Sequence, residues 1–81
     1  MFYTYTLYSK SRDIYYVGST GNLDDRIKRH NSGRSTYTKR EIPWILVYQM
    51  QYHTKSDAYQ AELYIKSQKS RKYLEDLICK L

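Results

Sequence analysis

The chain begins with two short runs of aromatic and β-branched residues separated by five polar residues. The runs are FYTYTLY, residues 2–8, and IYYVG, residues 14–18, with SKSRD between them. Short alternating runs of such residues are typical of β-strands, and a polar link of this kind between two of them is typical of a hairpin. This feature constrains the fold most, because it predicts an antiparallel pair of strands at the start of the chain.

The sequence GSTGN that follows predicts an abrupt change from strand to helix. Two glycines interrupt the strand, and Asn22 is a good N-cap residue. Two aspartates come next, in the first turn, where carboxylates complement the helix dipole. We therefore expect a helix over residues 23–31.

A third strand is predicted over residues 44–52, WILVYQMQY. Strict alternation would place Trp44, Leu46 and Tyr48 on the same side of the sheet. The residues between them are also apolar, so we expect the first half of this strand to be covered on both faces.

Two further helices complete the predicted order of elements. Thr54 or Ser56 can cap the first of them, and leucines at helical spacing after Ser70 predict a last helix that packs on the sheet. The expected fold is α+β, a small three-stranded antiparallel sheet flanked by helices, in the order strand, strand, helix, strand, helix, helix. A length of 81 residues favours one domain over residues 1–81.

Positive charge is the strongest signal in the composition. Fourteen Lys and Arg against eight Asp and Glu give a net charge of +6, and neither of the basic runs 26–40 and 66–72 contains an acid. Such an excess favours polyanionic partners, and eleven tyrosines suit a groove that faces phosphates and bases. The alternative is two solvated faces that aid solubility. The candidates for nucleic-acid contacts are Arg29, Arg34, Lys39, Arg40, Lys66 and Lys69.

Several classes of protein are disfavoured. The one cysteine, Cys79, cannot form an internal disulfide, and no Cys/His spacing resembles a zinc site. The longest apolar run, WILVY, has five residues, far fewer than the roughly 20 that span a bilayer. The first residues lack the features of a signal peptide. We expect a soluble, cytoplasmic protein.

Four side chains are expected to converge where the hairpin meets the first helix. Arg26 and His30 are four residues apart and therefore share one face of that helix. Tyr16 lies in the strand that leads into the helix, and Tyr5 lies on the partner strand. An arginine, a histidine and two tyrosines around one point suggest a site that holds a phosphate.

In order along the chain, these residues resemble the signature of the GIY-YIG nuclease superfamily. Tyr16-Val17-Gly18 is similar to its YIG half, and Tyr3-Thr4-Tyr5 is similar to the other half, with the glycine replaced. Arg26 matches the family arginine, His30 the family His or Tyr, and Glu62 the metal-binding glutamate. The resemblance covers nearly the whole chain and is to the small stand-alone bacterial branch similar to YhbQ and YazA, which is related to the N-terminal domain of UvrC.

The resemblance implies a metal-dependent endonuclease that hydrolyses phosphodiester bonds in DNA, as in DNA repair or recombination. It implies Glu62 as the ligand of Mg²⁺ or Mn²⁺, and Mg²⁺ keeps most of its waters and needs only one or two carboxylates. Arg26 would hold the phosphate through its guanidinium fork. The implied catalytic residues are Tyr5, Tyr16, Arg26, His30 and Glu62.

The general base is left open between Tyr16 and His30. A phenol has a pKa near ~10 and an imidazole near ~6.5, so intrinsic acidity favours His30. The resemblance favours Tyr16, with His30 assisting and Tyr5 orienting one of the two. For Glu62, the alternative is an exposed glutamate that pairs with Lys66 one helical turn later.

Two departures from the family pattern leave other functions open. No asparagine follows Asn31, whereas many active members carry one after the glutamate helix, and Ser19 stands where the UvrC-like branch has a lysine. Charge stabilisation is then either weaker or supplied by Lys66. The alternatives are a catalytically weak domain that binds nucleic acid and a basic module that docks an acidic protein.

The substrate is expected to be DNA, single-stranded, branched or duplex, with little sequence specificity. This expectation rests on the lack of a recognisable zinc finger or helix-turn-helix that would direct the chain to one sequence. The tyrosines favour exposed bases. RNA and the oligomeric state are left open.

Overall fold

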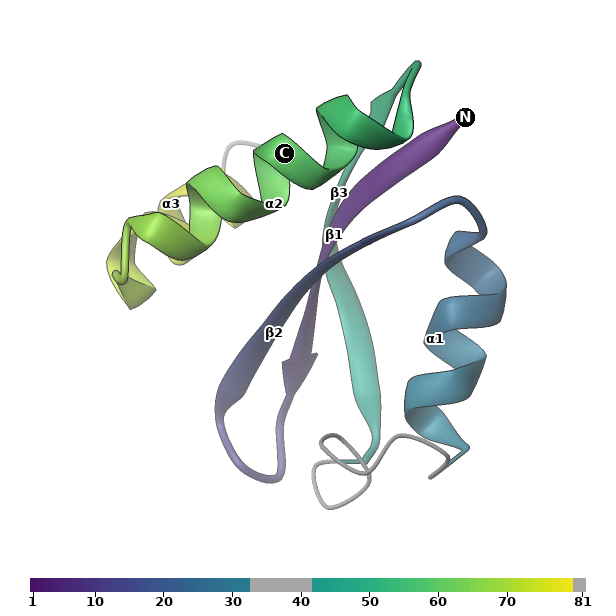
Figure 1. The fold of residues 1–81 in the computed structure, drawn as a ribbon. Helices are drawn as coiled ribbons and strands as arrows, with labels where there is room; N and C mark the ends of the chain where they lie inside the picture. Colours follow the sequence, from purple (N-terminus) through teal and green to yellow (C-terminus); the bar gives the residue numbers. More distant parts are fainter. Residues whose placement is uncertain (33–41, 80–81) are drawn as a thin grey trace.

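The computed structural model describes residues 1–32 and 42–79, which form three strands and three helices (Figure 1). The elements are β1 (Phe2–Ser9), β2 (Ile14–Thr20), α1 (Leu23–Asn31), β3 (Trp44–Tyr52), α2 (Lys55–Ser67) and α3 (Arg71–Cys79). The strands pair in the order β2-β1-β3, and both pairings are antiparallel. The α+β fold and the order of its elements are therefore as predicted, with β1 in the centre and β2 at an edge.

The helices begin where the sequence predicts, because the expected caps form. The side chain of Asn22 accepts a hydrogen bond from the backbone N–H of Asp25 at 3.1 Å. Thr54, rather than Ser56, caps α2, and its hydroxyl accepts from the N–H of Asp57 at 3.0 Å. Each cap satisfies a backbone donor that the first turn leaves unpaired.

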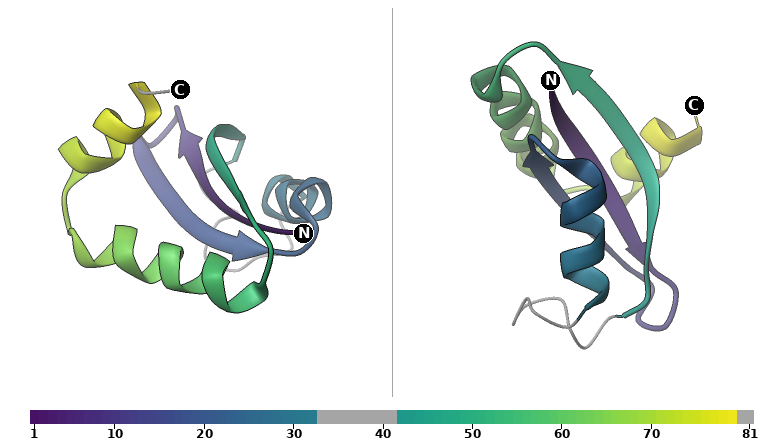
Figure 2. Two further views of the ribbon diagram at one scale, coloured as in Figure 1. Left: turned by 90° about the horizontal axis from the view of Figure 1, so that it is seen from above. Right: turned by 90° about the vertical axis from the view of Figure 1, so that its right-hand side faces the viewer.

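The sheet carries a separate hydrophobic cluster on each face. Figure 2 shows α1 on one side of the sheet and α2 and α3 on the other. On the first, here called the α1 face, Tyr5, Leu7 and Trp44 are buried against residues of α1. On the second, the α2 face, Val17 and Tyr48 pack with Ile65 of α2. The partly buried residues of α3 that complete the second cluster are Tyr73, Leu74, Leu77 and Ile78.

A β-bulge in β3 changes which side chains share a face. Thr6 of β1 pairs with Tyr48 and Leu7 pairs with Leu46, so Val47 is an extra residue in β3. The prediction that Trp44, Leu46 and Tyr48 lie on one side was therefore wrong, since Tyr48 joins the α2 face. The prediction that the first half of β3 is covered on both faces was also wrong, because Ile45 is 49% exposed.

Asn31, the last residue of α1, fixes that helix to the sheet. Its side-chain amide donates to the carbonyl of Trp44 at 3.1 Å and accepts from the N–H of Trp44 at 2.6 Å. The end of α1 is thereby held at the beginning of β3. None of the helices in the described ranges is both long enough and apolar enough to span a membrane.

Candidate active site

Gly18 allows Tyr5 to lie flat across β2. The two residues are directly paired in the β1–β2 register. A Cβ atom on Gly18 would lie 2.6 Å from the hydroxyl oxygen of Tyr5 and 2.8 Å from its Cζ. Carbon atoms do not approach that closely, so this position excludes a side chain. The glycine thus brings the Tyr5 phenol to the outer edge of the sheet.

Three aromatic rings gather around this point on the α1 face. The hydroxyl of Tyr5 lies within hydrogen-bond distance, 3.3 Å, of Nε2 of His30. The His30 and Tyr16 rings are tilted against one another, with centroids 4.7 Å apart. Tyr5 and His30 are only 1% and 4% exposed, whereas Tyr16 is half-buried. Tyr16 is therefore the ring of the three that solvent reaches most easily.

Burial and neighbouring charges set the protonation of these groups. Burial, and secondarily the charge of Arg26, lower the pKa of His30 below its ordinary value, which keeps the imidazole neutral at neutral pH. Burial is also the main reason that the pKa of Tyr5 is raised, with smaller contributions from Tyr16 and Glu62 in the same direction and an opposite one from Arg26. Tyr5 thus remains a neutral phenol.

Arg26 presents an uncompensated positive charge next to the rings. In the described part of the chain, no hydrogen bond or ion pair is made by its guanidinium group. The residue is half-buried and lines a hollow of about 220 Å³ with Ser19 of β2 and Lys55 of α2. A guanidinium held in place without a carboxylate partner is suited to bind a phosphate.

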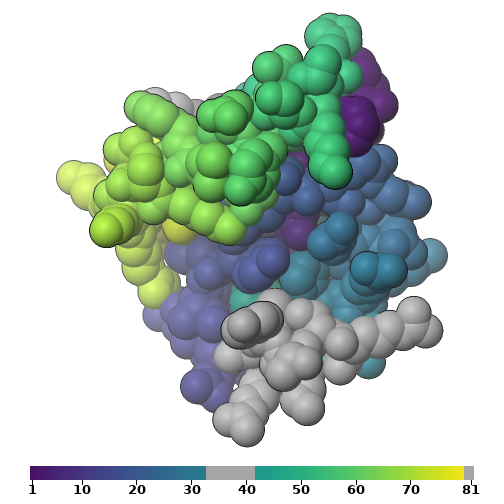
Figure 3. All heavy atoms as spheres, viewed as in Figure 1, coloured from purple at the N-terminus to yellow at the C-terminus, as the bar shows by residue number. Residues whose placement is uncertain are grey.

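Glu62 brings the opposite charge from the other face of the sheet. Its side chain is only 12% exposed. One carboxylate oxygen accepts a hydrogen bond from the hydroxyl of Ser19 at 2.7 Å, and the other accepts from the ammonium group of Lys66 at 2.5 Å. The predicted ion pair with Lys66 is present, but the glutamate is not an exposed one. In the space-filling view, α2 lies directly against β2 (Figure 3).

Comparison with models of protein families shows to which family this chain belongs. The model of the GIY-YIG catalytic domain matches residues 1–74. The chain belongs to the GIY-YIG family. This is a family of nucleases, so the resemblance noted in the sequence is confirmed.

Relatives within the GIY-YIG family are small bacterial proteins named UPF0213. One from Staphylococcus haemolyticus is 39% identical over 66 residues, which is 80% of this chain and 79% of the relative. YazA of Bacillus subtilis is 38% identical, over 76% of this chain and 67% of its own. A solution NMR structure of a UPF0213 protein from Bacillus halodurans has a TM-score of 0.60 and 34% identity, and the match covers 98% and 84% of the two chains.

The donor set of this GIY-YIG chain fits a cation that keeps most of its water. No cluster of three or more His, Cys, Asp or Glu side chains occurs in residues 1–32 and 42–79. Zinc would need such a cluster. Mg²⁺ binds through one or two carboxylates and fills its remaining positions with water and substrate oxygens. Glu62, with the hydroxyl of Ser19 beside it, fits that second kind of site.

The residues proposed for nucleic-acid contact divide into three groups. Arg29 pairs with Asp25 at 3.8 Å on the exposed side of α1, away from the rings. Lys66 and Lys69 line a groove beside β2. Three others, Arg34, Lys39 and Arg40, lie outside the described residues.

Sequence reasoning missed two residues of this site. It treated Ser19 as a departure from the family pattern, although the serine is the hydrogen-bond partner of Glu62. It passed over Lys55, which lines the hollow that holds Arg26. The spacing in the sequence could have revealed Lys55. It precedes Glu62 by seven residues, or two helical turns, and so lies on the same face of α2.

Proposed function

We propose that this chain is a divalent-metal-dependent endonuclease that hydrolyses phosphodiester bonds in DNA. One observation carries the proposal. The unpaired guanidinium of Arg26, the ring cluster around Tyr16 and the carboxylate of Glu62 come from different elements and meet at the outer edge of β2. Phosphodiester hydrolysis needs those three parts, a cationic clamp, a group that handles the proton of water and a ligand for a metal.

Each residue has a role that follows from its position. Arg26 binds the non-bridging oxygens of the scissile phosphate, where negative charge grows in the transition state. Glu62, oriented by Ser19, holds Mg²⁺ or Mn²⁺, which when bound supplies Lewis-acid stabilisation of the phosphate. Lys66 donates to the other oxygen of this carboxylate, so Ser19 and Lys66 together orient the group that would hold the metal.

We assign to Tyr16 the role of general base, which accepts the proton of the attacking water. Tyr16 is the accessible ring of the cluster, whereas His30 is buried behind it. His30 is then a positioning residue that packs against Tyr16 and holds the Tyr5 hydroxyl.

The first experiment is a cleavage panel of single-stranded, flapped and duplex DNA with Mg²⁺, with Mn²⁺ and with EDTA. We expect cutting only with metal, and most readily in the unpaired and branched substrates. Glu62→Gln should lower the rate about 10³-fold and leave DNA binding in EDTA unchanged. Glu75→Gln, an exposed glutamate of α3 that pairs with Arg71, is the matched control and should cut normally. Absence of metal-dependent cutting across the panel would overturn the proposal.

Two arginines of the same helix offer a second matched pair. Arg26→Ala should lower the cleavage rate about 10²- to 10³-fold, the range seen when one transition-state donor is removed. Arg29→Ala should stay within a few-fold of wild type, because Arg29 is exposed and already paired with Asp25. Equal losses in the two variants would contradict the assigned role of Arg26.

One observation favours a second candidate, a GIY-YIG domain that binds nucleic acid with little or no cleavage. Lys66 occupies one oxygen of Glu62, and an ammonium group there competes with a metal. In that case wild type and Glu62→Gln would bind DNA equally and neither would cut it. Binding should still weaken as salt rises, because contacts to phosphate release counterions.

A further inference from the structure

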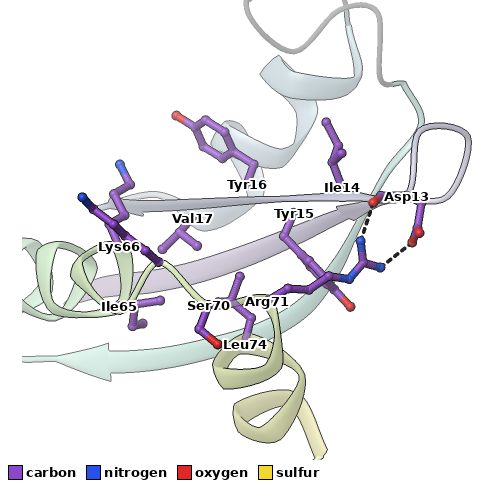
Figure 4. Close-up of a pocket in the computed structure, with 11 residues that line it drawn as sticks. Asp13, Ile14, Tyr15, Tyr16, Val17, Ile65, Lys66, Ser70, Arg71 and Leu74 are labelled. Carbon is purple, nitrogen blue, oxygen red and sulfur yellow. Dashed lines mark hydrogen bonds and ion pairs between the residues drawn. The ribbon is translucent and has the colours of Figure 1, made fainter.

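A groove of about 470 Å³ lies beside the outer edge of β2, where α2 ends and α3 begins (Figure 4). It is open to solvent, and its volume is within the range of roughly 300–1,000 Å³ common for ligand sites. Three elements contribute to it, and the residues that line it are Asp13, Ile14, Tyr15, Tyr16, Val17, Ile65, Lys66, Lys69, Ser70, Arg71 and Leu74.

The surface of the groove is mainly apolar and aromatic. Val17 and Tyr15 extend into the groove from β2, Ile65 from α2 and Leu74 from α3, whereas the ring of Tyr16 points to the opposite side of the strand (Figure 4). Aromatic and aliphatic side chains in this arrangement provide contact for a flat, weakly polar ring. A nucleobase is such a ring, and its faces are available only when it is neither paired nor stacked in a duplex.

The cations at the groove differ in what they already bind. Arg71 donates to the carbonyl and carboxylate oxygens of Asp13 at 2.8 and 2.6 Å and lies 5.2 Å from the centre of the Tyr15 ring, so it closes one end. Lys66 is held by Glu62. The ammonium group of Lys69 makes no hydrogen bond or ion pair within residues 1–32 and 42–79, although its backbone N–H donates to the carbonyl of Lys66. Lys69 is therefore the cation that a phosphate at this rim would meet.

The groove adjoins the candidate active site. Tyr16 and Lys66 line it, and Lys66 also donates to Glu62. The hollow of Arg26 and Lys55 is a separate one, reached farther along β2 at Ser19. Lys55 precedes Glu62 by seven residues of α2, about 10 Å along the helix, and Lys69 lies two residues beyond the end of α2. Lys55 lines the hollow of Arg26 and Lys69 lines the groove, so each cavity has a basic residue.

We propose that this groove binds the unpaired base of the nucleotide next to the scissile phosphate, with Lys69 on the adjoining phosphate. The inference rests on the proposed function and deepens it, because it makes single-stranded or flapped DNA the substrate class. The positive charge of Lys69 and the position of the groove next to Lys66 and Glu62 select a nucleotide over an apolar peptide. A base within a duplex does not fit, since its faces are covered by its neighbours.

The test compares two ligands that carry the same phosphates. Binding of an eight-residue oligothymidine and of an abasic oligomer of equal length is measured by fluorescence anisotropy in EDTA, so that no cleavage takes place. We expect the abasic oligomer to bind about 5- to 100-fold more weakly, the range for losing one stacked base. Equal affinity for the two ligands would overturn the proposal.

Lys69 permits a substitution that removes charge without strain. Its φ of 48° is in the left-handed region, which glycine adopts at no steric cost. Lys69→Gly should lower the slope of log affinity against log salt by about 0.7, the amount for one phosphate contact on a single strand, and keep the melting temperature. Lys72→Ala, an exposed lysine of α3 that does not line the groove, should leave the slope unchanged. Equal slopes for wild type and Lys69→Gly would contradict the assignment.

Methyl NMR spectra locate the base directly. Oligothymidine should shift the methyl signals of Val17, Ile65 and Leu74, and the abasic oligomer should shift them much less. Shifts confined to α1 and the start of α2 would overturn the groove proposal, even if metal-dependent cutting is present. Conversely, shifts in the groove without any cutting would support base binding and overturn the nuclease proposal, so the two failures are distinguishable.

Discussion

The two faces of the sheet bury different kinds of side chain. The α1 face buries only rings with polar atoms besides Leu7, namely Tyr5, Trp44 and His30, whereas the α2 face buries one such ring, Tyr48, among the aliphatic side chains of Val17 and Ile65. Rings with polar tips can pack in a core and still present a donor or acceptor at its rim. The α1 face therefore supplies the proton-handling groups, and the α2 face supplies the acid and the groove.

Gly18 of β2 lies against the Tyr5 ring of the α1 face. Replacing this residue should have the largest effect on the fold. Gly18→Ala places a methyl group against the Tyr5 ring, and overpacking of this kind costs about 3 kcal/mol. We expect that loss in the free energy of unfolding from urea titration, together with slower cleavage because Tyr5 is displaced. Gly21→Ala is the control, since its Cβ would meet only the Phe2 ring, at 3.2 Å. Similar losses in both variants would argue against a special role for Gly18.

The second prediction concerns the α1 face alone. Asn31→Ala removes both hydrogen bonds to the backbone of Trp44, and we expect a loss of about 2 kcal/mol because buried polar groups lose their partners. Thermal and urea unfolding measure it. Asn31→Asp keeps an acceptor for the N–H of Trp44 and should lose less. If the Asp variant were less stable than the Ala variant, the hydrogen bond from the N–H of Trp44 would not be the important contact.

The third prediction concerns two threonines of the α2 face, whose replacement should change the stability of the fold in opposite directions. The Thr4 hydroxyl donates to the carbonyl of Ala58 at 2.7 Å, whereas the buried Thr6 hydroxyl has no hydrogen-bond partner in the described part of the chain. Thr4→Val should destabilise the protein by about 1 kcal/mol, and Thr6→Val should stabilise it by a similar amount. Urea unfolding of both variants measures the two signs. The same sign in both would show that the hydroxyl bonds do not determine the difference.

The smallest expected effect is the pH dependence that His30 contributes. Its pKa is lowered in the folded protein, mainly by burial, so between the unfolded value of about 6.5 and the lower folded value only the unfolded chain binds the proton. This contribution to stability is fully present above about pH 6.5 and is lost as the pH falls toward the folded pKa. Unfolding free energies from pH 7.5 to 5 should decline more steeply in wild type than in His30→Phe. Parallel declines would contradict the assignment.

Local features of this fold could be predicted from the sequence because their causes are local. Asn22 and Thr54 mark the starts of two helices through bonds to backbone groups three residues away. The pairing of β1 with β2 follows from two alternating runs and a short link. The convergence of Tyr5, Tyr16 and His30 follows from the same hairpin and one helical turn.

Features that depend on distant contacts were not predictable in the same way. The bulge at Val47 has no sequence signal, because valine suits a regular strand equally well. The bonds between Asn31 and Trp44 join residues 13 positions apart. The pairing of Ser19 with Glu62 spans 43 positions. The groove exists only because β2, α2 and α3 come together in the folded chain.

The bulge in β3 fixes the number of residues in that strand. Trp44 and Leu46 precede the extra residue and serve the α1 face, whereas Tyr48 follows it and serves the α2 face. If β3 lost or gained one residue elsewhere, the side chains on one side of the change would all move to the opposite face of the sheet. Buried side chains of that part of the strand would then point toward the wrong cluster. Insertions and deletions should therefore be excluded from β3 during evolution, so that relatives align there without gaps.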